Sequence, residues 1–199
     1  MTVWTMAAAA LASATILLSS GARAASLDAW LYASGDDIVL SYSGQVDTAG
    51  FDFSTQNTFN GTTVGPDSRR FGATNGTYDL FFVSPPTAFS GETFGSGSSI
   101  TERDTATGDV FFVEILSGFA VVGLPAGASG VLDIAGGGTV EDETLASIGA
   151  VAGSYDFTLG NTSITLTVGS APPAIPLPAS LPLLAAGVGL LALRRRRGG

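Results

Sequence analysis

Short apolar segments separated by clusters of glycine, asparagine, aspartate and serine recur along most of this chain. Glycine alone accounts for 27 of its 199 residues. The apolar runs between the clusters are short, and several of them alternate apolar with polar residues. Short apolar segments separated by clusters of turn residues are typical of packed antiparallel sheets and not of a helical or βαβ domain. We therefore expect an all-β fold consisting of a single, jelly-roll-like β-sandwich.

The alternation also predicts where the strands lie. Residues 27–33 form a first strand, and residues 37–42 return across a turn at Gly35 and Asp36. A weaker third strand at 46–53 is interrupted by Gly50. The remaining strands are expected at 78–83, 110–116, 119–124 and 130–134, with a closing hairpin at 155–159 and 163–168. The runs at 110–116 and 119–124 are almost continuously apolar, which predicts central strands covered on both faces.

Two long polar stretches interrupt the strands, the first predicting a loop or irregular edge structure and the second a loop. Residues 54–76 are rich in asparagine, threonine and glycine, and residues 89–109 have a similar character. Residues 141–148 are the one plausible helix, because Glu141, Asp142 and Glu143 supply the acidic first turn that a helix N-terminus favours.

Composition excludes several classes of function. The chain has no cysteine and no histidine, which removes thiol nucleophiles, thiolate metal sites, and the commonest general base. Residues 25–170 hold three basic residues against 17 acidic ones, a formal net charge of −14, and such a surface repels nucleic acid. Catalysis by two carboxylates and calcium binding by oxygen ligands remain open.

The C-terminus carries three consecutive elements. The first is a proline-spaced motif of Ile175, Pro176, Leu177, Pro178 and Ala179. An apolar run at 181–193 follows, and then four basic residues, Arg194, Arg195, Arg196 and Arg197. The prolines keep the motif extended, the apolar run can enter a bilayer, and the arginines hold its end on the cytoplasmic side. As a helix the run spans about 20 Å, less than a hydrocarbon core of about 30 Å.

This tail resembles the C-terminal sorting signal of the PEP-CTERM class, in its VPLPA-CTERM variant, with isoleucine in place of the first valine. The resemblance implies an exosortase-type membrane transpeptidase as a partner and a Gram-negative bacterial source. It also implies transient contact with the membrane through the 181–193 helix, with the 194–199 tail in the cytoplasm. A plain C-terminal membrane anchor is the alternative interpretation.

The N-terminus agrees with export. An alanine-rich apolar stretch at 6–18 precedes Ala22, Arg23 and Ala24, which read as an A-x-A cleavage site. We expect a signal peptide at 1–24, an exported domain at 25–170 and a proline-rich linker at 171–180. The order of motifs between 26 and 169 resembles a domain that often precedes PEP-CTERM signals, and no functional residues are carried over from it.

The exported domain offers few candidate sites. Asp104 and Asp109 flank a glycine turn and supply two carboxylates for calcium, but a solvated turn is the favoured interpretation. Trp30, Tyr32 and Tyr42 form a sugar-stacking face if they are exposed together, and ordinary sheet packing if they are not. No catalytic residues are predicted. We therefore expect a non-enzymatic cell-surface or extracellular-matrix protein associated with exopolysaccharide; the alternative is a calcium- or carbohydrate-binding surface module.

Overall fold

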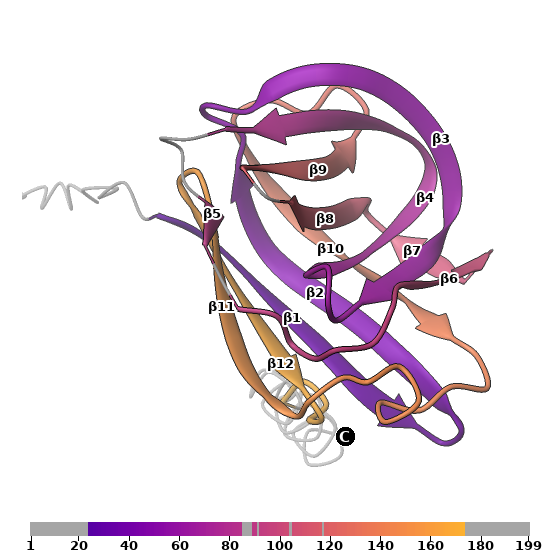
Figure 1. Ribbon diagram of the computed structural model, residues 1–199. Coiled ribbons are helices and arrows are strands. Elements are labelled where there is room, and N and C mark those ends of the chain that lie inside the picture. Colours follow the sequence, from indigo (N-terminus) through magenta and orange to yellow (C-terminus); the bar gives the residue numbers. More distant parts are fainter. Residues whose placement is uncertain (1–23, 85–88, 91, 104, 117, 174–199) are drawn as a thin grey trace, which may run out of the picture.

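The computed structural model describes residues 24–84, 89–90, 92–103, 105–116 and 118–173. The described residues form strands and turns and contain no helix. The strands make two sheets that pack face to face in a sandwich-like arrangement (Figure 1). The all-β, two-sheet architecture expected from the sequence is therefore confirmed.

The first sheet has seven strands, with the N-terminal strand in its middle. Their order is β5 (Phe89–Ser90), β11 (Gly153–Leu159), β12 (Thr162–Val168), β1 (Ala25–Ser34), β2 (Asp37–Asp47), β10 (Val131–Val140) and β7 (Ala106–Gly108). The pair β1–β12 is parallel, and the other pairs are antiparallel.

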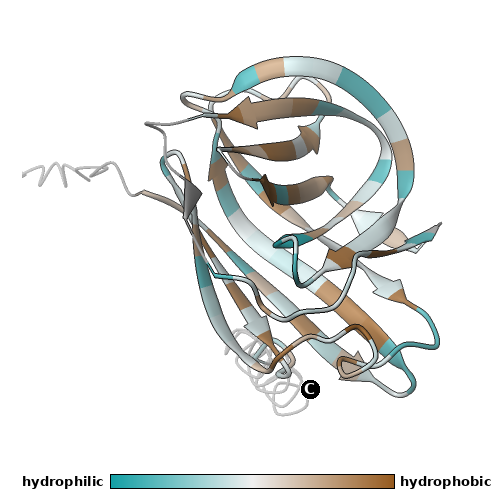
Figure 2. Cartoon of the chain, viewed as in Figure 1, coloured by the Kyte–Doolittle hydropathy of each residue, from teal (hydrophilic) through white to brown (hydrophobic). Residues whose placement is uncertain are grey.

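The second sheet is antiparallel and strongly curved. Its order is β6 (Ile100–Arg103), β3 (Asp52–Gly65), β4 (Arg70–Val83), β8 (Phe111–Leu116) and β9 (Phe119–Pro125). The long hairpin of β3 and β4 arches over β8 and β9 (Figure 1). Figure 2 shows that β8 and β9 are strongly hydrophobic, whereas β3 alternates between hydrophilic and apolar residues.

Aromatic side chains between the two sheets form the centre of the core. Phe71 of the second sheet is fully buried, and its ring lies 5.7 Å from that of Phe157 in the first sheet. It also contacts the rings of Phe94 and Phe111, both at 6.2 Å. Burial of side chains of this size is the main force that holds such sheets together.

Both predicted hairpins of the first sheet are confirmed. Strands β1 and β2 pair with the turn at Gly35 and Asp36, and β11 pairs with β12. In β1 the buried side chains Leu27, Ala29 and Leu31 alternate with exposed or half-buried ones, as the sequence pattern predicted.

The loop interpretation is wrong for both stretches, whereas the alternative of edge structure agrees with residues 52–60, which pair with β4 and lie beyond the residues paired with β6. Residues 54–76 belong almost entirely to β3 and β4, and residues 89–109 contain the three short strands β5, β6 and β7. The polar stretch was misleading because the first half of β3 is exposed on both faces, so no apolar alternation marks it. Threonine, which is frequent there, nevertheless suits an extended strand.

Two further expectations need correction. The weak strand at 46–53 is divided, since β2 ends at Asp47 and β3 begins at Asp52. The helix at 141–148 is a series of turns, in which the hydroxyls of Thr144 and Ser147 bond to each other and to nearby backbone groups. Side chains that compete for backbone groups in this way favour turns over helices.

Candidate functional site

The outer face of the second sheet, opposite the core, is hollowed by the course of β4. Residues 70–73 of β4 pair with β8, and residues 78–83 pair with β9. Because β8 and β9 also pair with each other, β4 runs as a U around them (Figure 1). Gly76 lies at the bend with a φ of +97°, a backbone conformation that residues other than glycine rarely adopt.

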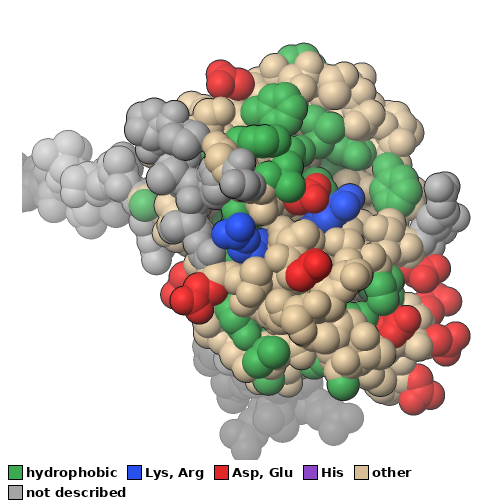
Figure 3. All heavy atoms as spheres, in the orientation of Figure 1, with side chains coloured by type: hydrophobic (Ala, Val, Ile, Leu, Met, Phe, Trp, Pro, Cys, Tyr) green, Lys and Arg blue, Asp and Glu red, His purple; other side chains and the backbone are tan. Residues whose placement is uncertain are grey.

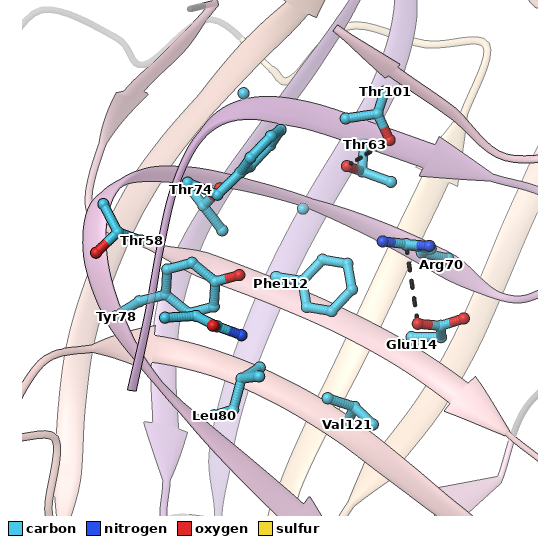
Figure 4. A pocket seen from close by; sticks show the side chains of 14 residues that line it. Thr58, Thr63, Arg70, Thr74, Tyr78, Leu80, Thr101, Phe112, Glu114 and Val121 are labelled. Atoms are coloured by element: carbon cyan, nitrogen blue, oxygen red, sulfur yellow. Dashed lines mark hydrogen bonds and ion pairs between the residues drawn. The ribbon is translucent and has the colours of Figure 1, made fainter. Parts of the chain in front are cut away.

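The hollow is a groove of about 470 Å³. Its hydroxyl and amide groups come from Asn57, Thr58, Thr63, Thr74, Tyr78 and Thr101. Its apolar side chains are Phe59, Leu80, Phe112 and Val121, and its two charged ones are Arg70 and Glu114 (Figure 4). The volume lies in the range of small-molecule sites, and the lining is more polar than the mostly apolar lining of a typical small-molecule pocket.

Strand alternation explains how these residues share one face. In β4 the side chains of Phe71 and Ala73 enter the core, so Arg70, Gly72 and Thr74 face the groove. Gly72 allows β8 to approach closely at this point, because a Cβ there would overlap the backbone of Phe111 and Phe112.

The strands β8 and β9 were expected to be covered on both faces, and this expectation is wrong. Their core-facing residues are buried, but Phe112, Glu114 and Val121 on the other face are only partly buried and line the groove. Figure 3 shows apolar side chains gathered on this face, beside an adjacent acidic and basic pair. The apolar side chains on this second face therefore line the groove in place of a second core.

Arg70 and Glu114 form the charged end of the groove. They are direct partners across β4 and β8, with 3.9 Å between the Arg70 Nε and a Glu114 carboxylate oxygen. The Arg70 guanidinium also lies over the Phe112 ring, 5.0 Å from its centroid. Burial raises the pKa of the Tyr78 hydroxyl, an effect that the charge of Arg70 partly offsets, so this hydroxyl is a neutral donor at physiological pH.

Thr74 carries a buried hydroxyl with no hydrogen-bond partner among the described residues. Its side chain lines the groove, although the residue is only 4% exposed. By contrast, the Thr63 hydroxyl on the neighbouring strand is 3.1 Å from that of Thr101. Buried polar groups are nearly always hydrogen-bonded, so an unpartnered one on the wall of a groove points to a ligand.

The predicted aromatic face is not formed. Tyr42 is buried in the core, and its hydroxyl donates to the carbonyl oxygen of Asp109 at 2.6 Å. Trp30 and Tyr32 lie on the opposite face of the same sheet, where they are half-buried. Ordinary sheet packing is therefore the correct interpretation of Tyr42, which does not share a face with Trp30 and Tyr32.

The calcium candidates are not brought together in the described part of the chain. Asp109 accepts a hydrogen bond from the Ala135 backbone N–H at 3.0 Å, so its carboxylate stabilises the junction with β10. Asp104 lies outside the described residues. Within those residues there is no group of three acidic side chains placed to hold a metal ion.

The predicted terminal signals lie almost wholly outside the described residues. This is true of Ala22, of Ile175, Pro176, Leu177, Pro178 and Ala179, and of Arg194, Arg195, Arg196 and Arg197, whereas Ala24 is the first described residue and is exposed. Among the residues that the structure describes, no helix has the length and apolar character needed to cross a bilayer.

The sequence interpretation missed the groove residues Asn57, Arg70, Thr74, Tyr78 and Glu114. Three of them lie in the stretch that was expected to be a loop. One signal was present: the runs at 78–83 and 111–116 are apolar apart from Asp79, Glu114 and the Tyr78 hydroxyl, and they offer apolar side chains to both faces of a strand.

Comparisons with known proteins find no match for this chain. No protein-family model matches it, and searches of curated proteins and of solved structures find no match either. The groove and the terminal signals are therefore the evidence for function.

Proposed function

We propose that this chain is an exported, non-enzymatic protein of the cell surface or extracellular matrix, whose β domain binds a polysaccharide in the groove of the second sheet. Residues 25–170 then form a jelly-roll-like sandwich that presents the groove. Export and sorting by an exosortase-type transpeptidase are inferred from the terminal signals in the sequence. The protein is held at the outer surface or in exopolysaccharide.

The observation that carries the binding proposal is the buried, unpartnered hydroxyl of Thr74 in the groove wall. Leaving such a group without a partner costs about 1–3 kcal/mol. A ligand hydroxyl that reaches Thr74 recovers this cost. The site therefore favours a ligand that brings its own hydrogen-bonding groups.

Saccharides fit the remaining chemistry of the groove. A sugar ring has an apolar C–H face and a rim of hydroxyls that both donate and accept hydrogen bonds. The rings of Phe59 and Phe112 supply apolar surface, and Asn57, Tyr78 and Thr74 supply donors and acceptors. Aromatic surface combined with a few polar groups fixes the orientation of a ligand as well as its affinity.

The groove favours binding over hydrolysis. Among its described lining residues Glu114 is the one carboxylate, and it is paired with Arg70. Hydrolysis of a glycosidic bond ordinarily requires two carboxyl groups on either side of that bond. We therefore assign the groove a non-catalytic role.

Affinity electrophoresis tests the binding proposal. The full-length chain, in mild detergent, is run through gels that contain soluble polysaccharides, including exopolysaccharide extracted from the source cells. We expect retardation in at least one gel, and its reduction by Asn57→Ala and Phe112→Ala. Trp30→Ala, on the far face of the first sheet, is the matched control and should migrate as the unaltered chain does.

If Trp30→Ala reduced the retardation as much as Asn57→Ala and Phe112→Ala do, the loss of binding could not be attributed to the groove. Migration of the unaltered chain without retardation in every gel would contradict the binding proposal. Retention is tested separately, by fractionating cells that produce the chain with and without residues 176–199. Equal release of the two forms into the medium would show that the tail does not hold the protein.

A further inference from the structure

We propose that the groove takes an uncharged stretch of glycan and discriminates against acidic polysaccharides. This inference deepens the binding function proposed above and rests on it. It follows from the balance of charge inside the groove and from the field around it.

Inside the groove the two charges cancel. Arg70 and Glu114 are the charged side chains among the described lining residues, and they face each other at 3.9 Å. The face of the Arg70 guanidinium is occupied by the Phe112 ring. Arg69, the neighbour of Arg70 in the chain, does not line the groove. The one cation that lines the groove among the described residues, Arg70, already has Glu114 as its counter-charge. A ligand carboxylate would therefore have to compete with Glu114 for Arg70.

Outside the groove the field opposes anions. Residues 25–170 carry 17 acidic side chains against three basic ones. Many of the acidic side chains visible in Figure 3 lie along the margin of the molecule, on either side of the groove face. A polyanion that lies across this face carries charges well beyond the groove, and at moderate ionic strength it meets this repulsion over about 10 Å.

The uncharged polar groups of the groove suit a neutral ligand instead. Thr74, Tyr78 and Asn57 offer hydroxyl and amide groups, each of which can both donate and accept. Hydrogen bonds to such groups do not depend on ionic strength. We therefore expect the chain to bind a neutral glycan with an affinity that does not change with salt concentration.

A panel of matched polysaccharides tests the inference. The full-length chain is titrated with hydroxyethyl cellulose, galactomannan and dextran as neutral probes, and with alginate and polygalacturonate as acidic ones. Each titration is made at low and at high sodium chloride. We expect at least one neutral probe to bind with a Kd that changes less than about twofold between the two salt concentrations, and the acidic probes to bind at least about tenfold more weakly at low salt.

The outcomes separate this inference from the binding function on which it rests. Preferential binding of an acidic probe, weakened by salt, would overturn the inference while supporting the binding function. Binding of no probe, together with no binding of the exopolysaccharide from the source cells, would overturn both.

One substitution tests the charge balance directly. Glu114→Gln keeps the size of the side chain and leaves Arg70 without its counter-charge. We expect this variant to gain about fivefold in affinity for polygalacturonate at low salt, and to lose the gain at high salt. The double variant Arg70→Gln, Glu114→Gln restores neutrality and should lose the gain at low salt as well. A folded Glu114→Gln variant without any gain would refute the role of this pair.

Discussion

Replacing Thr74 by valine should make the protein more stable and its ligand weaker. Valine has nearly the same shape as threonine and removes only the buried hydroxyl that lacks a partner among the described residues. The residue is 4% exposed, so water recovers little of the cost of burying this group. Removing an unpartnered buried hydroxyl without changing the packing should raise the free energy of unfolding by about 1–3 kcal/mol.

The same change should weaken binding of the ligand by about threefold to tenfold, the worth of one neutral hydrogen bond. Thr63→Val is the matched control, since that residue is 5% exposed on the same face and its hydroxyl is bonded to Thr101 at 3.1 Å. The control should lose about 1 kcal/mol of stability, because it breaks a hydrogen bond that already exists.

Urea unfolding followed by circular dichroism measures both variants. For a domain of this size each kcal/mol shifts the melting midpoint by about 2–4 °C, so calorimetry is an independent check. A Thr74→Val protein that is less stable than the unaltered chain would show that the hydroxyl is satisfied in the folded state. The argument that reserves it for a ligand would then fail.

Three other predictions concern the core and the tail. Phe71→Ala should cost about 3–5 kcal/mol in urea unfolding, because Phe71 is fully buried at the centre of the core; Phe53→Ala, 61% exposed, should cost under about 0.5 kcal/mol, and equal losses would contradict this placement of the core. Burial raises the pKa of Tyr42 well above its ordinary value of 10.0. The folded chain therefore holds this proton where the unfolded chain releases it, and the free energy of unfolding should fall as pH rises above about 10. Tyr42→Phe should flatten that fall, and an unchanged slope would exclude Tyr42 as its source. Intact-mass measurement of protein extracted from the cell surface should find a C-terminus within residues 176–180; a species that retains Arg194 to Arg197 would identify a plain membrane anchor.

The sequence predicted those strands in which one face is buried and the other is not. The alternation of β1 and the hairpin of β11 and β12 are visible because each buries every second side chain. The first half of β3 exposes both faces, so its residues gave no periodic signal and were interpreted as a loop. Asn75 and Gly76 are a turn signal in sequence, and in the structure they form the bend within β4.

The groove could not be predicted from the sequence for a different reason. Its charged pair depends on the register of β4 against β8, which aligns Arg70 with Glu114. Register is set by which residues the core buries across both strands, and a shift of one residue would turn every one of these side chains to the other face. Composition showed correctly that few basic residues exist in the domain, but the position of one of them at the mouth of a groove is a property of the folded sheet.

Strand β4 links the stability of the fold to its proposed function. Phe71 and Ala73 fix its register from the core side, and Arg70, Gly72 and Thr74 alternate with them on the groove side. Asp79 adds to this fixing, because its carboxylate accepts a hydrogen bond from the Gly127 backbone N–H at 2.7 Å. A register held so firmly by the core tolerates one unsatisfied hydroxyl on the other face. An unsatisfied buried hydroxyl is a local cost in stability of the kind that binding sites often carry. Stabilisation together with loss of binding in Thr74→Val is therefore the result that separates a binding groove from an incidental hollow.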